Sequence, residues 1–319
     1  MARTTDVATL VRNARDGDPR SVARLISLVE DASPQLREVM AALMPFTGRA
    51  HIIGLTGAPG VGKSTATSAL VSAFRARGQR VGVLAVDPSS PFSGGALLGD
   101  RIRMQDHATD PGVFIRSMAS RGHLGGLSWS TPQALRVLDA VGVDVILLET
   151  VGVGQSEIEV VGVADTVLVL LAPGMGDGIQ AAKAGILEIG DIFVVNKADR
   201  EGAATTAREL THMISLGDRS AGAWVPPVLQ TVASREEGID KAVAAIDRHW
   251  AWADETGELA RRRVRRASEE IEAIVVAELR SRMGNLRGDV RLGELAVAVV
   301  GGALDPYAAA DELLAALGS

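Results

Sequence analysis

The sequence contains no cysteine, and this absence excludes disulfide bonds and thiolate metal sites. Its five histidines show none of the paired spacing that imidazole metal sites need; they are His51, His107, His123, His212 and His249. No apolar run reaches the roughly 20 residues of a transmembrane helix, and the first six residues lack the apolar region of a signal peptide. We therefore expect a cytoplasmic protein that functions without a membrane.

The net charge is −6, so the basic footprint of a nucleic-acid-binding protein is also missing. Hydrophobic residues make up 47% of the chain and charged residues 23%, which is typical of a globular protein. At 319 residues, the chain is long enough for a large α/β domain with smaller helical additions.

A glycine-rich stretch follows a short apolar run and has the spacing G-x-x-x-x-G-K-[ST]; it consists of Gly57, Ala58, Pro59, Gly60, Val61, Gly62, Lys63 and Ser64. An amphipathic helix is predicted directly after it, from Thr65 to Phe74. The glycines let backbone N–H groups point at one anion, and the helix N-terminus adds partial positive charge. Lys63 is expected to reach the β- and γ-phosphates, and the Ser64 hydroxyl to hold Mg²⁺. The predicted phosphate site comprises these eight residues and Thr65.

Short apolar strands alternate with helices over residues 51 to about 232, which predicts an α/β P-loop NTPase fold with a mainly parallel, helix-covered sheet. The predicted strands cover residues 52–56, 81–86, 113–115, 145–148, 166–171, 192–195 and 228–229. Amphipathic patterns predict N-terminal helices and a C-terminal helical arm with a long helix over 258–283. We expect an N-terminal helical segment at 1–48, a P-loop GTPase domain at 49–252 and a C-terminal helical segment at 253–319.

Acidic residues stand near the ends of the predicted strands, where ligands of parallel sheets bind. Asp87 and Asp100 are candidates to hold Mg²⁺ directly or through water, with structural capping as the alternative for each. Glu149 ends a strand before a glycine-rich loop that suits a sensor of the γ-phosphate. In that loop Gly152 lets a backbone N–H approach the phosphate, and Gln155 either orients water or makes only local hydrogen bonds.

The sequence N-K-x-D at residues 196–199 ends another predicted strand. An aspartate here can accept hydrogen bonds from the ring N1–H and the exocyclic amino group of guanine, whereas adenine presents an acceptor at N1. The pattern therefore favours GTP, and a loop after the next strand is expected to lie over the base edge. The predicted base-binding residues are Asn196, Lys197, Asp199, Thr231, Val232 and Ala233.

Four segments in this order, VDPSSPFSGGALLGDR, ETVGVGQSE, GDGIQ and NKAD, resemble the MeaB/ArgK group of P-loop GTPases. The resemblance is specific over residues 45–235. It implies a GTPase that uses GTP/GDP and Mg²⁺ and acts as a chaperone for an adenosylcobalamin-dependent acyl-CoA mutase. Methylmalonyl-CoA mutase is the expected partner. A related acyl-CoA mutase is the alternative partner, because the segment at 91–93 is similar to a subset near the GTPase domains fused to other acyl-CoA mutases.

The resemblance also implies roles for single residues. Ser64, Asp87, Asp100 and Glu149 would form the Mg²⁺ and hydrolysis shell, and the candidate catalytic residues are Lys63, Asp87, Asp100, Glu149, Gly152 and Lys183. Residues 87–104 and 149–157 would be switches I and II, and residues 173–183 a third switch that conveys the nucleotide state to the mutase. No arginine finger stands out, so slow hydrolysis that the mutase accelerates is expected, together with a homodimer formed through the C-terminal helices.

Five arginines cluster at the start of the predicted long helix: Arg261, Arg262, Arg263, Arg265 and Arg266. Such a run is typical of a solvated helix face, and binding to an acidic surface of a partner subunit is the alternative.

Three other functions are less consistent with the residues. A metal-insertion GTPase for a nickel enzyme needs clustered soft or imidazole ligands, which the cysteine and histidine content does not favour. An ATP-dependent kinase linked to amino-acid transport conflicts with the N-K-x-D sequence. A scaffold without nucleotide conflicts with the intact P-loop.

Overall fold

The computed structural model describes residues 6–88, 104–120, 130–150, 160, 162–174, 187–217, 220, 222–282 and 290–317. The elements in the first half are α1 (Val7–Arg15), α2 (Pro19–Glu30), α3 (Leu36–Leu43), η1 (Met44–Phe46), β1 (His51–Thr56), α4 (Lys63–Ala76), β2 (Val81–Pro88), η2 (Gln105–His107), β3 (Val113–Ser120), α6 (Thr131–Ala140) and β4 (Val145–Thr150). Those in the second half are β5 (Thr166–Leu171), α9 (Leu187–Ile189), β6 (Ile192–Asn196), α10 (Ala203–Ser215), β7 (Val228–Thr231), η4 (Ala233–Arg235), α11 (Ile239–Glu255), α12 (Glu258–Arg282), α13 (Val290–Val300) and α14 (Pro306–Leu317).

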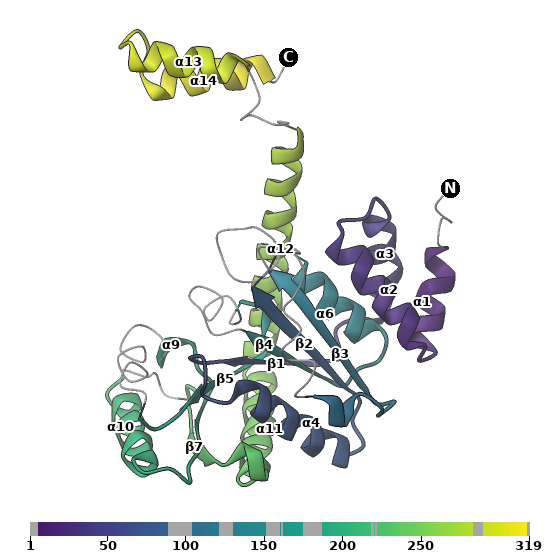
Figure 1. The fold of residues 1–319 in the computed structure, drawn as a ribbon, viewed down its shortest axis with the longest axis vertical. Helices are drawn as coiled ribbons and strands as arrows, with labels where there is room; N and C mark the ends of the chain where they lie inside the picture. The colour runs from purple at the N-terminus through teal and green to yellow at the C-terminus, as the bar shows by residue number, and fades with distance from the viewer. Residues whose placement is uncertain are drawn as a thin grey trace. The chain divides into compact units, whose positions relative to one another are not determined.

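Within the described residues, one seven-stranded sheet has the order β3-β2-β4-β1-β5-β6-β7, and every neighbouring pair is parallel. Figure 1 shows this sheet at the centre of the fold. The prediction of a parallel, helix-covered P-loop NTPase sheet is confirmed. Because all strands point the same way, their carboxyl ends form one edge of the sheet and their starts form the opposite edge.

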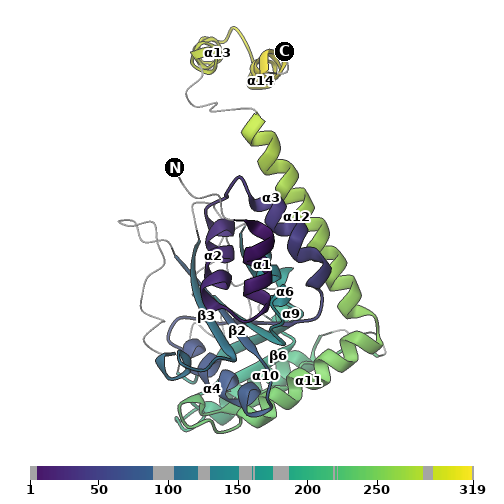
Figure 2. The same ribbon diagram turned by 90° about the vertical axis from the view of Figure 1, so that its right-hand side faces the viewer.

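The two faces of the sheet carry separate apolar cores, because successive strand residues point to opposite faces. Ile52 packs into the core shared with α1, α2, α3, α6 and α10. Ile53 and Leu55 pack into the core shared with α4 and α11. Figure 2 shows the same helices turned by a quarter, with α4 and α11 close together. Both faces are therefore buried, as near-continuous apolar strands predict.

An aspartate caps the start of each of the first two helices. Asp6 accepts a hydrogen bond from the backbone N–H of Thr9 at 3.2 Å, and Asp18 accepts one from Ser21 at 2.9 Å with a proline at the first helical position. Their apolar faces are buried in the sheet's core. These helices therefore cap the sheet, as their amphipathic pattern indicates.

The chain divides into two compact units, Met1–Arg266 and Ala267–Ser319. The second unit contains the later residues of α12 with α13 and α14, and α13 and α14 contact each other. It exposes large apolar side chains along α12, including Ile271 at 63%, Val275 at 51% and Leu279 at 53%. No helix in the described part of the chain combines the length and the apolar character needed to cross a membrane.

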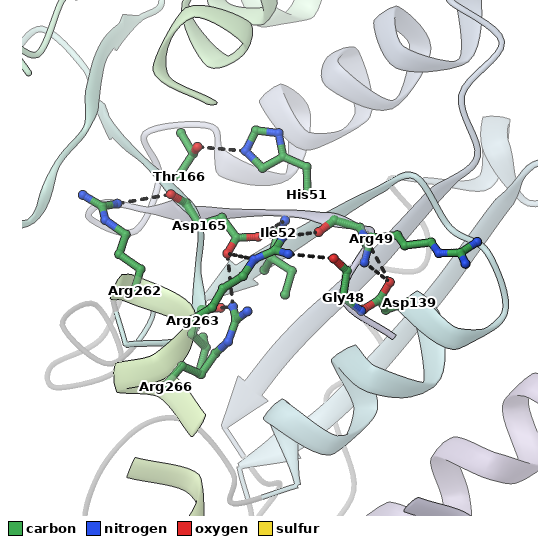
Figure 3. Close-up of polar contacts among 12 residues, drawn as sticks. Gly48, Arg49, His51, Ile52, Asp139, Asp165, Thr166, Arg262, Arg263 and Arg266 are labelled. Atoms are coloured by element: carbon green, nitrogen blue, oxygen red, sulfur yellow. Dashed lines mark hydrogen bonds and ion pairs between the residues drawn. The ribbon is translucent and has the colours of Figure 1, made fainter. Parts of the chain in front are cut away.

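The arginine run at the start of α12 corrects one prediction. Arg261 and Arg265 are exposed, as expected of a solvated face, but Arg262, Arg263 and Arg266 face the sheet (Figure 3). Arg266 lies three residues after Arg263 and four after Arg262, so it shares a side of the helix with both. The run therefore divides into an exposed pair and an inward-facing group.

The three inward arginines bind two buried aspartates at the starts of β5 and β6. Arg262 donates to both oxygens of Asp191 at 2.8 and 2.9 Å. Arg263 lies 3.2 Å and Arg266 3.5 Å from the carboxylate of Asp165, whose side chain is fully buried. The run therefore anchors α12 to its own sheet, and neither expectation for it holds at these three positions.

A hydrogen-bonded chain extends this anchor to β1. His249 lies 3.2 Å from Asp191 and 2.8 Å from the hydroxyl of Thr166, which is also 2.8 Å from the ring of His51. Burial alone would raise the pKa of Asp191, but hydrogen bonds from His249 and Arg262 outweigh it and lower the pKa to about 2. Asp191 is therefore ionised at neutral pH.

Replacing Arg263 by alanine should destabilise the fold far more than replacing its neighbour Arg261. The Arg263 side chain is 25% exposed and pairs with a fully buried carboxylate, whereas Arg261 is 61% exposed. Leaving the Asp165 charge with a weaker partner is expected to lower the free energy of unfolding by about 2–3 kcal/mol. The matched Arg261→Ala change should cost less than about 1 kcal/mol. Urea denaturation of both variants measures the difference, and equal losses would contradict the anchoring role.

Candidate functional site

The glycine-rich loop lies between the end of β1 and the start of α4. Lys63 opens α4, is only 7% exposed, and its ammonium group donates to the carbonyls of Gly57 at 2.5 Å and Ala58 at 3.2 Å. The ammonium group thus lies over the loop that it is expected to serve. The loop and the helix N-terminus together place backbone N–H groups and a positive charge on one side.

Two glycines of this loop have no room for a side chain. Gly57 has φ +138°, and an added Cβ would lie 2.2 Å from the carbonyl oxygen of Leu170. Gly62 has φ +97°, and its Cβ would lie 2.5 Å from the amide nitrogen of Asn196. Both positions therefore require glycine for space and for backbone conformation.

A buried carboxylate stands beside the loop. Glu149 on β4 is 4% exposed, and the Ser64 hydroxyl donates to its Oε1 at 2.6 Å. The other oxygen, Oε2, lies 3.0 Å from the hydroxyl of Thr67. Ser64 and Glu149, which sequence analysis names as separate candidates for the Mg²⁺ shell, are therefore in direct contact.

Thr67 is a contributor that sequence reasoning missed. It is fully buried one turn after Lys63 on α4 and contacts the Lys63 carbonyl as well as Glu149. Its signal is the i+4 spacing from Lys63, which places both on one helix face. That spacing does not reveal the partner, because Glu149 is 82 residues away in the sequence.

Asp87 lies at the carboxyl end of β2, one residue after Val86, which is paired with Thr150 in the neighbouring β4. Its backbone therefore lies at the same edge as Glu149. Asp100, Gly152 and Lys183 lie outside the described residues, and so does Gln155.

Asn196 holds two loops together. Its Nδ2 donates to the carbonyl of Val61 in the glycine-rich loop at 2.9 Å. Its Oδ1 accepts from the Ala233 backbone N–H at 3.0 Å and from the Thr231 hydroxyl at 3.2 Å. The side chain is 3% exposed. Asn196 therefore fixes the position of the loop after β7 relative to the loop after β1.

Two further residues of N-K-x-D, Lys197 and Asp199, follow Asn196 and are more exposed than it is. Lys197 adopts a positive φ of 57° and donates to the carbonyl of Gly60 at 2.6 Å. Asp199 keeps 39% of its side chain exposed and has Arg235 at 3.7 Å. The structure thus brings the glycine-rich loop, N-K-x-D and residues 231–233 together at the carboxyl edge of the sheet. Asp199 is the member of the set whose carboxylate is open to a ligand.

Among the described residues, no three His, Cys, Asp or Glu side chains are grouped so as to hold a metal ion. His51 and His249 approach each other only through Thr166.

Residues 22–286 match the family model described as methylmalonyl-CoA mutase-associated GTPase MeaB. The chain is 48% identical over 307 residues to a putative GTPase of Pyrococcus horikoshii, covering 96% of each protein. It is 33% identical over 275 residues to the mitochondrial methylmalonic aciduria type A homolog of Caenorhabditis briggsae, covering 81% of this chain and 67% of that protein. A crystal structure of a LAO/AO transport system kinase superposes over 100% of both chains with a TM-score of 0.75 and 26% identity.

Replacing Asn196 and Asp199 separately should distinguish the bridge from the open carboxylate. Asn196→Ala removes the bonds to Val61, Thr231 and Ala233 and leaves buried polar groups without partners. We expect it to lower the free energy of unfolding of the nucleotide-free protein by about 2–3 kcal/mol. Asp199→Ala should change that free energy by less than about 0.5 kcal/mol, because its pair with Arg235 is long and exposed. Denaturation of both variants without nucleotide tests this, and a stable Asn196→Ala protein would contradict the bridge.

Proposed function

The chain is a P-loop GTPase that belongs to the MeaB family, and we propose that it is a GTP-driven switch regulating an adenosylcobalamin-dependent acyl-CoA mutase. The observation that carries the proposal is the 2.6 Å hydrogen bond from Ser64 to the buried Glu149. It joins the phosphate-binding loop to the strand from which residues 149–157 continue. A group that binds at Ser64 therefore acts directly on the start of that segment. Methylmalonyl-CoA mutase is the proposed partner, because the matching family model carries its name.

The carboxyl edge of the sheet suits Mg²⁺ bound with the nucleotide. Mg²⁺ prefers hard oxygen ligands and is commonly held by one or two carboxylates together with phosphate oxygens. The Ser64 hydroxyl and the Glu149 carboxylate are already adjacent, and Asp87 stands at the end of the neighbouring strand. We assign these three residues and Asp100 to the Mg²⁺ shell, where the ion would neutralise charge on the phosphates.

Guanine is proposed to bind against Asp199 and residues 231–233. The exposed carboxylate can accept two hydrogen bonds from the guanine edge, which adenine cannot supply. The buried Asn196 supports this proposal, because its hydrogen bonds fix Ala233 relative to the glycine-rich loop, where the phosphates are proposed to bind. Lys197, which bonds the Gly60 carbonyl, ties the same two regions.

Three segments are proposed as switches: residues 87–104, 149–157 with Gly152, and 173–183 with Lys183. Each begins within two residues of the carboxyl end of a described strand, namely β2, β4 and β5. This placement supports the proposal because contacts with the γ-phosphate exist only in the GTP state and act on segments at this edge. The third segment, through Lys183, is proposed to convey the nucleotide state to the mutase.

The homodimer is proposed to form through the C-terminal helices. The second unit exposes apolar side chains on all three of its helices, among them Ile271 at 63%, Val297 at 73% and Tyr307 at 85%. Large exposed apolar patches on a protein commonly mark sites of interaction with another protein.

Nucleotide selectivity and mutase stimulation test the proposed function. Nucleotide-free protein is titrated with GDP, a GTP analogue and ATP in Mg²⁺, and hydrolysis is then measured with and without methylmalonyl-CoA mutase. We expect guanine selectivity and faster hydrolysis with the mutase. Asp199→Ala should weaken GDP binding by about 10- to 100-fold, the value of a hydrogen bond to a charged group. Glu149→Gln should slow hydrolysis by at least about 100-fold while GDP still binds.

Each failure of that experiment has its own meaning. Guanine selectivity without stimulation by any acyl-CoA mutase would remove the proposed partner and leave the GTPase. Preference for ATP would contradict the role of Asp199 and favour the amino-acid transport kinase.

The dimer is tested by the mass of the protein in solution. We expect a dimer by light scattering, and a monomer for Ile271→Glu/Val275→Glu, because two charges on the apolar side of α12 would have to be desolvated in the interface. The control is Leu216→Glu, which places a charge at a 71% exposed apolar position in the first unit and should remain dimeric. A monomeric parent protein would refute the proposal.

A further inference from the structure

A cavity of about 660 Å³ opens at the edge of the sheet where the strands begin. Its wall includes His51, the first residue of β1, and Val145, the first residue of β4. The glycine-rich loop follows the other end of β1, and a strand of six residues spans roughly 17–20 Å. The cavity is therefore separate from the candidate nucleotide site.

Three parts of the first compact unit form the cavity. Arg15 and Phe46 come from the N-terminal helices, Arg80 from the start of β2, and Asp247 and Trp250 from α11. A volume of this size lies within the roughly 300–1,000 Å³ of small-molecule sites. The cavity can therefore hold a molecule the size of a nucleotide.

The carboxylates in the wall are already paired. Asp139 accepts hydrogen bonds from the backbone N–H groups of residues 48–50. Asp144 accepts from the backbone N–H of Arg80 at 2.7 Å, and Asp247 forms an ion pair with Arg77 at 3.0 Å. Each of these three carboxylates therefore already has at least one donor within the fold.

Within the described residues, two of the wall's three arginines, Arg15 and Arg49, donate no side-chain hydrogen bond to a protein acceptor. Arg80 donates to the carbonyl of Val141 at 2.9 Å, which neutralises the negative end of α6. Arg15 lies over the ring of Phe46 at 3.5 Å, and neither it nor Arg49 has a carboxylate partner within the described part of the chain. Figure 3 shows the Arg49 side chain directed away from the arginine–aspartate anchor of α12. Two guanidinium groups thus remain available to an anion.

Other groups in the wall suit a polar, planar ligand. Gln79 Oε1 is buried and finds no hydrogen-bond donor among the described residues, which is uncommon for a buried oxygen. Trp250 is partly exposed, with its ring 4.0 Å from that of His51. Burial lowers the pKa of His51 to about 3, so this ring is neutral and adds no charge of its own.

We propose that this cavity is a second ligand site, which binds a small organic anion whose phosphate or carboxylate pairs with Arg15 and Arg49 and whose planar N–H-bearing ring lies by Trp250 and Gln79. Arginine recognises both kinds of anion through paired N–H groups. Because the site lies at the opposite edge of the sheet from the glycine-rich loop, its existence does not depend on the proposed function.

The test uses the full chain saturated with GDP and Mg²⁺, so that the P-loop is occupied. Calorimetric titration with AMP, which carries both a phosphate and a planar ring, is expected to give one saturable site per chain. Arg49→Ala should weaken this binding by at least about tenfold, the loss of one charge-assisted hydrogen bond. The control is Arg248→Ala, which removes the same charge from an exposed position of α11 outside the wall. GDP binding equal to that of the parent protein shows that each variant is folded.

Two further arms define the chemistry. Inorganic phosphate should compete with AMP, and adenosine should bind at least about tenfold more weakly, because it lacks the anion. Absence of AMP binding up to about 10 mM, which corresponds to less than 3 kcal/mol of affinity, would overturn the proposal. Equal binding of adenosine and AMP, or binding that Arg49→Ala leaves unchanged, would also overturn it.

Discussion

The candidate site depends on one uncharged side chain, the amide of Asn196. It donates to the glycine-rich loop at Val61 and accepts from the loop after β7 at Ala233. Because a buried amide is costly to leave unpaired, neither loop can move without breaking a bond that nothing else replaces. The same close approach excludes any side chain at Gly62, whose Cβ would meet the amide nitrogen. The glycine-rich loop and the loop after β7 are thus held in position relative to each other by the protein itself.

The opposite edge of the sheet is held by charge. Asp165 accepts from the N–H of Ile52, and Asp191 accepts from that of Val167, so each carboxylate satisfies a backbone donor at the start of a strand. Carboxylates are suited to this position because, when ionised, they only accept hydrogen bonds. Burying them requires countercharge, which the inward arginines of α12 supply. The ion pairs that hold the strand starts therefore also fix the first turns of α12 on the domain.

Local patterns predicted the fold and named several residues that the structure brings together at one edge of the sheet, because the information lies within short segments. The glycine-rich loop, the apolar strands and the acidic end of β4 are each visible within about ten residues of sequence, and the parallel sheet follows from their alternation. The arginine run was predicted wrongly at three positions because its partners are distant: Arg262 meets Asp191 from 71 residues away, and Arg263 meets Asp165 from 98. The inward role of Asn196 was missed for the same reason, since Val61 lies 135 residues before it. The sequence shows that these charged and amide side chains are present, but it does not show which of them contact each other in the folded protein.

β1 runs from one edge of the sheet to the other, but the contacts that hold it differ from the side-chain contacts around His51. β1 is paired on both sides, to β4 and β5, and so connects His51 to the glycine-rich loop as a rigid element with one arrangement. The chain from His51 through Thr166 and His249 to Asp191 is built of two hydrogen bonds and a 3.2 Å contact between His249 and Asp191. Coupling between distant sites requires an element with two arrangements that both sites can bias. In the first compact unit, this chain of contacts links His51, in the cavity wall, to Asp191, the carboxylate that Arg262 binds.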